Sequence, residues 1–258
     1  MINIQIASDL HIDYNNENVN IDFKEYLQFP CISNNINILI LPGDIGCLYK
    51  LKQLENFLRE LSSKYDYIFY VYGNNEFYYY NEEQKKTYEE LISEGKSLLK
   101  IPNLYILNNK SLIIGDYMFV GCTLWSKLYF NDYFPSYFRI HNFTKYKYNK
   151  LFDKDLEYIK QSICYSKMNN KKLIIITHYP PITFKKNITY KYDNFYNNNL
   201  YELIYNNPNI LYWIHGHNHK STVSKINSTL IVSNQKGKYG DKGDKYKKYN
   251  KNFSIKLN

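Results

Sequence analysis

Five short segments of the sequence combine Asp, Asn and His at spacings typical of metal ligands. The segments are Asp9-Leu10-His11, Gly43-Asp44, Gly73-Asn74-Asn75-Glu76, His178 and His215-Gly216-His217-Asn218-His219. Their carboxylate, amide and imidazole groups suit Mn, Fe, Zn or Ni ions in five- or six-coordinate sites, not a cysteine-rich structural zinc site. A core histidine or a Gly-Asp turn would explain one segment alone. Five of the chain's six histidines lie in these segments, so we predict one shared site.

The spacing within two of these segments predicts their geometry. One residue separates Asp9 from His11, and one residue separates His217 from His219. Side chains at this spacing point the same way on an extended backbone. We therefore expect each pair to lie on an extended segment and to face the same site.

Each segment follows, within one residue, a short and largely apolar run that is typical of a buried strand. The runs cover residues 2–7, 36–41, 67–72, 172–177 and 210–214. Amphipathic helices are predicted between them at about 50–64, 82–99, 151–167 and 199–206. Since sites assemble at the carboxyl ends of strands in open α/β sheets, the polar segments should meet at one sheet edge.

Further strands predict mixed sheets in a layered α/β fold. Hairpins are expected over residues 111–125, turning at Gly115-Asp116, and over residues 221–234, with a last strand over residues 252–257. Residues 126–150 are rich in Tyr and Phe but have no clear period. No repeat or linker divides the chain, so we predict a single domain over residues 1–258.

The composition reflects strong A/T codon bias, with 34 Asn, 30 Tyr and 31 Lys against two Arg and one Ala. This bias indicates a virus- or parasite-encoded protein. It also weakens the inference of a nucleic-acid partner from the net charge of +9, because lysine accumulates under such bias. With no signal-peptide pattern and no apolar run near the ~20 residues of a membrane helix, we expect a cytoplasmic protein without a membrane partner.

In their fixed order, the motifs Asp-x-His, Gly-Asp, Gly-Asn-x-Glu, His and Gly-His-x-His resemble those of the calcineurin-like metallophosphoesterase family. The resemblance runs from Asp9 to His219, which is most of the chain. It implies a four-layer α/β/β/α sandwich with two mixed β-sheets, and a phosphoesterase with two divalent metal ions. A hydroxide bridging the ions would attack the substrate's phosphate in line.

Carried over position by position, the resemblance implies two groups of three ligands around one bridging carboxylate. The first group is Asp9, His11 and His219, the second is Asn74, His178 and His217, and Asp44 is the bridge. Glu76 would fix its loop. His215 would either support the ligands or pack in the core.

One position departs from the family pattern. Most members carry a histidine after the metal-binding Asn, where it contacts the phosphoryl oxygen and protonates the leaving group, but this chain has Asn75. A carboxamide donates hydrogen bonds but supplies no proton at neutral pH. General acid catalysis contributes about 10²–10⁴-fold, so its loss favours a phosphodiesterase over a phosphomonoesterase or protein phosphatase. Arg139, Tyr179 and Lys236 could supply other donors or could be packing and surface residues.

We expect a small phosphodiester or a nucleotide as the substrate. A nuclease is the alternative favoured by the lysine-rich stretch over residues 236–251. A non-catalytic interaction protein on the same fold is a further alternative. It is disfavoured because such scaffolds tend to lose metal ligands, whereas all seven ligand positions here hold competent residues.

Overall fold

The buried strands form two mixed sheets. A computed structural model describes residues 1–15, 21–29, 34–132, 134, 138–183, 198–238 and 249–257. The first sheet consists of β11 (Ser254–Leu257), β1 (Ile2–Ile6), β2 (Ile36–Pro42), β3 (Tyr67–Val71) and β4 (Leu104–Ile106). The second sheet consists of β5 (Lys110–Ile114), β6 (Tyr117–Cys122), β7 (Lys172–Thr177), β8 (Ile210–Ile214), β10 (Thr229–Ser233) and β9 (Thr222–Ile226). For both sheets, the strands are named in their order across the sheet.

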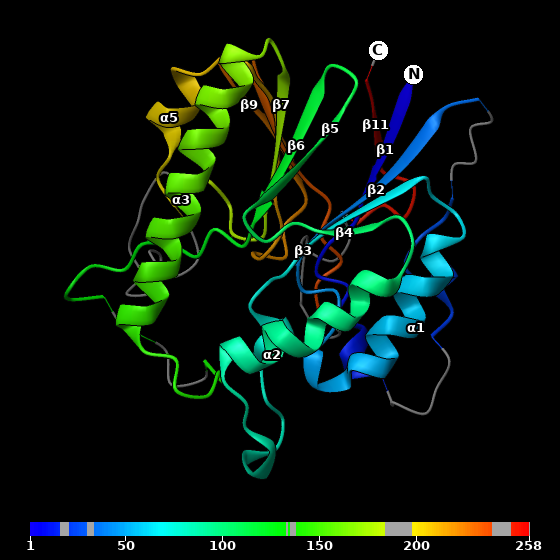
Figure 1. Ribbon diagram of the computed structural model, residues 1–258, viewed down its shortest axis with the longest axis vertical. Coiled ribbons are helices and arrows are strands. Elements are labelled where there is room, and N and C mark those ends of the chain that lie inside the picture. Colours follow the sequence, from blue (N-terminus) through cyan, green and yellow to red (C-terminus); the bar gives the residue numbers. More distant parts are fainter. Residues whose placement is uncertain are drawn as a thin grey trace.

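Each sheet combines a run of parallel strands with antiparallel pairing at one or both edges. Strands β1 to β4 run parallel, and β11 pairs antiparallel with β1. Strands β6, β7, β8 and β10 run parallel, while β5 and β9 pair antiparallel at the two edges. The antiparallel pairing of β1 with β11 places the two chain ends side by side (Figure 1). Both sheets are therefore mixed, as predicted.

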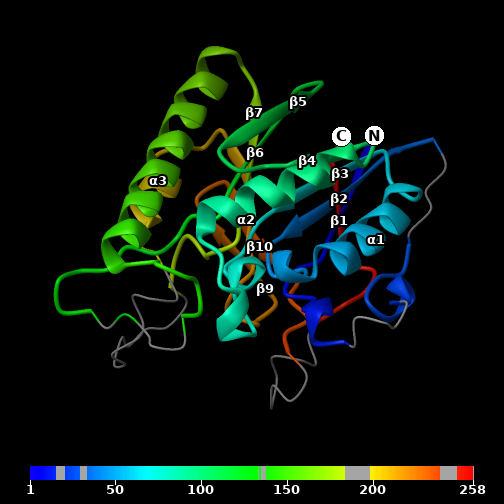
Figure 2. The same ribbon diagram turned by 60° about the horizontal axis from the view of Figure 1, so that its bottom comes forward.

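Helices cover the outer face of each sheet and complete four layers. Helices α1 (Leu51–Ser62) and α2 (Tyr88–Gly95) pack on the first sheet, and α3 (Lys145–Met168) and α5 (Tyr201–Tyr205) on the second (Figures 1 and 2). Alternate strand residues face the helices or the other sheet. Phe69 and Phe119, for example, meet between the sheets with ring centroids 4.8 Å apart. The predicted α/β/β/α sandwich is confirmed.

Three details of the elements differ from expectation. Helix α3 begins at Lys145, not near residue 151, because Thr144 caps it by accepting a hydrogen bond from the backbone N–H of Lys147. Helix α2 is shorter than predicted and is flanked by two 3₁₀ turns. Strand β4 was not predicted, because a three-residue strand leaves little periodic pattern. No helix in the described part of the chain is long and apolar enough to cross a membrane.

The buried Asp155 of α3 holds the chain segment that follows β6. Its carboxylate accepts hydrogen bonds from the Leu124 backbone N–H at 2.8 Å and from the Asn109 side chain at 2.7 Å. The adjacent Thr123 carbonyl accepts hydrogen bonds from the backbone N–H groups of His178 and Tyr179. Asp155 therefore helps to set the position of the segment that carries His178.

Asp155 should make stability depend on pH in an identifiable window. Burial raises the pKa of Asp155 from 3.8 to about 6, so the folded protein binds this proton more tightly than the unfolded chain. Protonation of Asp155 therefore stabilises the folded state. This stabilisation is complete below pH 4 and is lost as the pH rises through 6. In urea unfolding, the free energy of unfolding of the wild type minus that of Asp155→Asn should fall by about 3 kcal/mol across this window. A difference that does not change with pH would contradict this assignment.

Candidate metal centre

The predicted ligands follow the carboxyl ends of β1, β2, β3, β7 and β8, as expected. The prediction of extended backbone at Asp9 and His11 is wrong, because both residues have left-handed conformations with φ of 53° and 48°. His217 and His219 are likewise left-handed, with φ of 79° and 51°. Asp44 also has a positive φ of 54°. Such conformations are rare outside glycine and cluster at functional sites.

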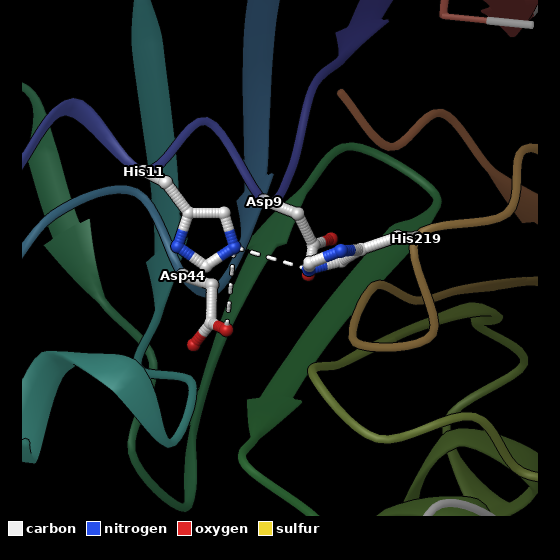
Figure 3. A group of neighbouring side chains, drawn as sticks. All are labelled: Asp9, His11, Asp44 and His219. Carbon is white, nitrogen blue, oxygen red and sulfur yellow. Dashed lines mark hydrogen bonds and ion pairs between the residues drawn. The ribbon is translucent and has the colours of Figure 1, made fainter. Parts of the chain in front are cut away.

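One group of ligand atoms forms around His11 (Figure 3). Its Nε2 atom lies 3.1 Å from Nε2 of His219 and 3.8 Å from Oδ2 of Asp44. His219 Nε2 in turn lies 3.6 Å from Oδ1 of Asp9. One ligand atom from each of these four residues can be chosen so that all lie within 4.8 Å of one another. The four side chains come from three segments that are far apart in the sequence, and they converge on one point.

A second group forms around His178. Its Nε2 atom lies 3.0 Å from Oδ1 of Asn74 and 3.1 Å from Nδ1 of His217. It also lies 3.4 Å from Oδ1 of Asp44. Because Oδ2 of Asp44 faces the group around His11, the two oxygens of this carboxylate address different groups. Asp44 therefore has the placement that a bridging ligand requires.

The spacing of the donor atoms fits divalent metal ions. Nitrogen ligands lie about 2.1 Å from zinc, so neighbouring ligands of one ion are about 3.0–3.4 Å apart. The contacts of 3.0 and 3.1 Å within the two groups match this separation. The Nδ1–H of His178 donates to the Pro42 carbonyl at 2.9 Å, which leaves Nε2 as the ligand atom.

The charges of the site also fit bound cations. Burial lowers the pKa of His178 to about 4 and the pKa values of His11 and His217 well below their usual range, so these imidazoles are neutral. Burial, together with repulsion from Asp44, raises the pKa of Asp9. Burial likewise raises the pKa of Asp44. Neutral imidazoles beside buried carboxylates favour an ion that offsets the carboxylate charge.

Glu76 fixes the loops that carry the ligands. Its fully buried carboxylate accepts hydrogen bonds from the backbone N–H groups of Gly73, Asp44 and Ile45, at 2.8, 3.0 and 2.7 Å. It also accepts a hydrogen bond from the Tyr70 hydroxyl at 2.7 Å. Glu76 thus ties the loop after β2 to the loop after β3.

The Asn74 amide is oriented by a tyrosine. Its Nδ2 donates to the Tyr78 hydroxyl at 3.1 Å, which turns Oδ1 toward His178. The preceding Gly73 leaves room for the bridge, because a Cβ there would collide with Oδ1 of Asp44. Only glycine lets the chain pass this close to the carboxylate.

Asn75 uses its backbone and its side chain for different contacts. Its backbone N–H donates to Oδ1 of Asp44 at 2.8 Å. Its side-chain Nδ2 donates to Oδ2 of Asp13 at 3.1 Å, and the Tyr80 hydroxyl donates to the same oxygen. The buried Asn75 carboxamide is therefore held by Asp13, and the group has no acidic proton to give to a leaving group.

Two of the candidate supporting residues lie behind the ligands. The ring of Tyr179 stacks on His217 with a centroid distance of 3.9 Å and is fully buried. His215 is also fully buried, and its Nδ1 lies 3.1 Å from the Gly216 carbonyl. Both residues are thus placed to pack against the ligand segments from within the core.

The candidate cations Arg139 and Lys236 stack on aromatic rings. The Arg139 guanidinium lies 5.7 Å from the ring centroid of Tyr78 and 5.4 Å from that of Tyr80. Lys236 Nζ lies 4.9 Å from the ring centroid of Tyr26. Arg139 therefore packs on the two tyrosines whose hydroxyls contact Asn74 and Asp13, whereas Lys236 packs beside the 3₁₀ turn Phe23–Glu25.

Sequence reasoning missed several polar groups beside the ligands. Asp13, Tyr78 and Tyr80 contact the two asparagines of the loop after β3, and Tyr14 packs edge-on against His11 with centroids 5.8 Å apart. The spacing Asp-x-His-x-Asp over residues 9–13 was a usable signal for Asp13. The tyrosines gave little signal in a chain with 30 of them.

Comparisons with known proteins agree with this architecture. The family model of calcineurin-like phosphoesterases matches residues 2–221. An uncharacterised protein of Acanthamoeba polyphaga mimivirus is 32% identical over 266 residues, covering 91% of this chain and 90% of that protein. A viral relative is compatible with the source indicated by the codon bias.

Similar solved structures share the fold at low sequence identity. A phosphopantetheinyl hydrolase from Mycobacterium tuberculosis is 11% identical with a TM-score of 0.62, and the similarity covers 91% of this chain and 89% of that chain. A dimetal phosphatase from Danio rerio is 12% identical with a TM-score of 0.53, covering 90% and 86%. Together with the two groups of ligand atoms, the matches to the family model and to the viral relative show that the chain belongs to the calcineurin-like phosphoesterase family.

Proposed function

We propose that this metal-dependent phosphoesterase is a phosphodiesterase that acts on a nucleotide or another small phosphodiester. The observation that carries the proposal is the Asn75 carboxamide, which is held by Asp13 where most family members place a histidine. Transfer of a phosphoryl group from a monoester passes through a loose transition state, in which the leaving oxygen carries much of the charge. A site without a general acid there is better suited to diesters.

The seven ligands support two ions. Asp9, His11 and His219 would hold one, Asn74, His178 and His217 the other, and Asp44 would contact both. When bound, divalent ions supply a nucleophile at neutral pH and offset the charge of the phosphate. The likeness to the fold of a dimetal phosphatase supports a centre with two ions, and the donor atoms suit Mn, Fe, Zn or Ni.

The chain's own groups orient this chemistry. The Asn75 backbone N–H and the Glu76 carboxylate fix Asp44 and its loop, so the carboxylate needs little rearrangement when ions bind. Hydrogen bonds from the Ser8 hydroxyl and the His217 backbone N–H hold the Asp9 carboxylate in the same way. None of these contacts supplies a proton to the leaving oxygen, so good leaving groups should react fastest.

The substrate class is tested by comparing two chromogenic esters. With Mn²⁺, Ni²⁺ or Zn²⁺, the purified protein should hydrolyse bis-p-nitrophenyl phosphate with a higher kcat/KM than p-nitrophenyl phosphate. Chelation of the metal should abolish both activities. Faster hydrolysis of the monoester would overturn the diesterase proposal. No turnover of either ester, together with no bound metal by elemental analysis, would overturn the enzymatic function.

The bridging role of Asp44 is tested by Asp44→Asn. An amide offers one oxygen in place of two and carries no charge, so kcat/KM should fall at least about 100-fold and metal content should decrease. The matched control is Asp116→Asn in the exposed turn between β5 and β6, which should leave both unchanged. If Asp44→Asn retains the wild-type rate and metal content, Asp44 is not the bridge.

The missing acid is tested by Asn75→His. An imidazole at this position can donate to Asp13 through one nitrogen and offer a proton through the other. The variant should raise kcat/KM for diesters with alkyl leaving groups at least about tenfold more than for p-nitrophenyl esters. Asn75→Gln, which has no acidic proton, should show no such selectivity. Equal changes for both leaving groups in Asn75→His would show that acid catalysis does not limit the enzyme.

A further inference from the structure

The turn after β10 brings a second lysine to the candidate metal centre. Ser8 and Gln235 form an isolated parallel bridge, so the chain after β10 runs beside the segment that carries Asp9. The backbone N–H of Gly237 donates to the Asp9 carbonyl at 3.0 Å, and Gly237 has a φ of 77°. Beyond this turn, Lys238 Nζ lies over the Tyr14 ring, whereas Lys236 Nζ lies over the Tyr26 ring.

Lys238 lies against Tyr14, whose ring contacts the proposed ligand His11. Its Nζ lies 5.2 Å from the ring centroid of Tyr14, and the Tyr14 hydroxyl is its hydrogen-bonding partner. The Tyr14 ring in turn packs edge-on against His11. Tyr14 is 53% exposed, so this pair lies where the candidate metal centre meets solvent.

The positive charge of Lys238 affects the pKa values of residues in both groups of proposed ligands. Burial lowers the pKa of His11 and of His217, and Lys238 adds to this effect on each. Burial raises the pKa of Asp13 and of Asp44, and Lys238 opposes it in both cases. The ammonium therefore lies within electrostatic reach of these groups, and the chain of contacts from Lys238 to Tyr14 and from Tyr14 to His11 places it beside the site.

The other cations at the site have different neighbours. Lys50 donates to the Asp13 carbonyl at 2.8 Å, and Arg139 stacks on Tyr78 and Tyr80. Lys236 lies over the Tyr26 ring. Of these cations, Lys238 has the position best suited to an anion that binds across Asp44.

We propose that Lys238 binds the substrate's phosphate, with its ammonium donating a hydrogen bond to a non-bridging oxygen. It thereby supplies a fixed positive charge to a centre in which Asn75 supplies no proton. The proposal rests on the phosphoesterase function and names a substrate-binding residue for it. A cation held in place stabilises the transferring phosphate without moving a proton. It also draws the singly charged diester and the doubly charged phosphate ion into the site.

The test measures binding of inorganic phosphate as well as turnover. In the Mn²⁺-loaded protein, Lys238→Met should weaken phosphate binding about 10–100-fold by isothermal titration calorimetry and lower kcat/KM for bis-p-nitrophenyl phosphate by a similar factor. Lys238→Arg keeps the charge and should retain most of both. The dependence of phosphate binding on salt should be shallower in Lys238→Met than in the wild type.

Two further lysine variants serve as comparisons. Lys225→Met on the exposed face of β9 makes the same change in net charge and should leave phosphate binding unchanged. Lys236→Met should have a smaller effect than Lys238→Met. Equal phosphate binding in the wild type and Lys238→Met, or a larger effect from Lys236→Met, would overturn the proposal.

The outcomes separate this inference from the proposed function. If the wild type hydrolyses the diester and Lys238→Met is unchanged in both measurements, the lysine assignment fails and the phosphodiesterase function stands. If the wild type binds phosphate through Lys238 but hydrolyses neither ester, the phosphodiesterase function fails and the assignment of Lys238 as a phosphate ligand stands.

Discussion

The carboxylate of Asp44 is buried, and its two oxygens face His11 and His178, two imidazoles that burial keeps neutral. A buried carboxylate in such surroundings is costly unless positive charge reaches it. Much of the surrounding structure holds this carboxylate in place. The Asn75 backbone N–H donates to it, Glu76 binds the backbone on either side of the site, and Gly73 leaves room for it. The need to place Asp44 at one point thus accounts for the local sequence of two separate loops.

The same constraint explains the strained backbone. Asp9, His11, Asp44, His217 and His219 all adopt positive φ, which costs free energy at residues other than glycine. Hydrogen bonds between the ligand segments oppose this cost. The backbone N–H of Asp9 donates to the Gly43 carbonyl, that of His11 to the Asp44 carbonyl, and that of Gly216 to the His178 carbonyl. The ligand side chains converge because the segments bind one another through their backbones.

The sequence predicted most of the fold and the side chains that meet at the candidate centre, but not the backbone conformations that present them. The strand ends were identifiable because buried apolar runs precede each polar segment, and five motifs in a fixed order imply the four-layer sandwich. The left-handed backbone of Asp9 and His11 follows from contacts with the loop after β2, which no local pattern encodes. The first turns of α3 were missed because few of their residues are buried, so no apolar period marks them. Lys238 was missed because its place depends on a bridge between Ser8 and Gln235, which are 227 positions apart.

We propose that two divalent ions bind on opposite sides of Asp44, each held by its own group of three ligands. The most direct measurement is a crystal structure of the protein grown with Mn²⁺, with anomalous diffraction data recorded above the manganese absorption edge. We expect two anomalous peaks roughly 3.5–4 Å apart, one beside each oxygen of Asp44. A single peak within one group, or manganese bound elsewhere while the seven side chains keep their contacts with one another, would contradict this proposal.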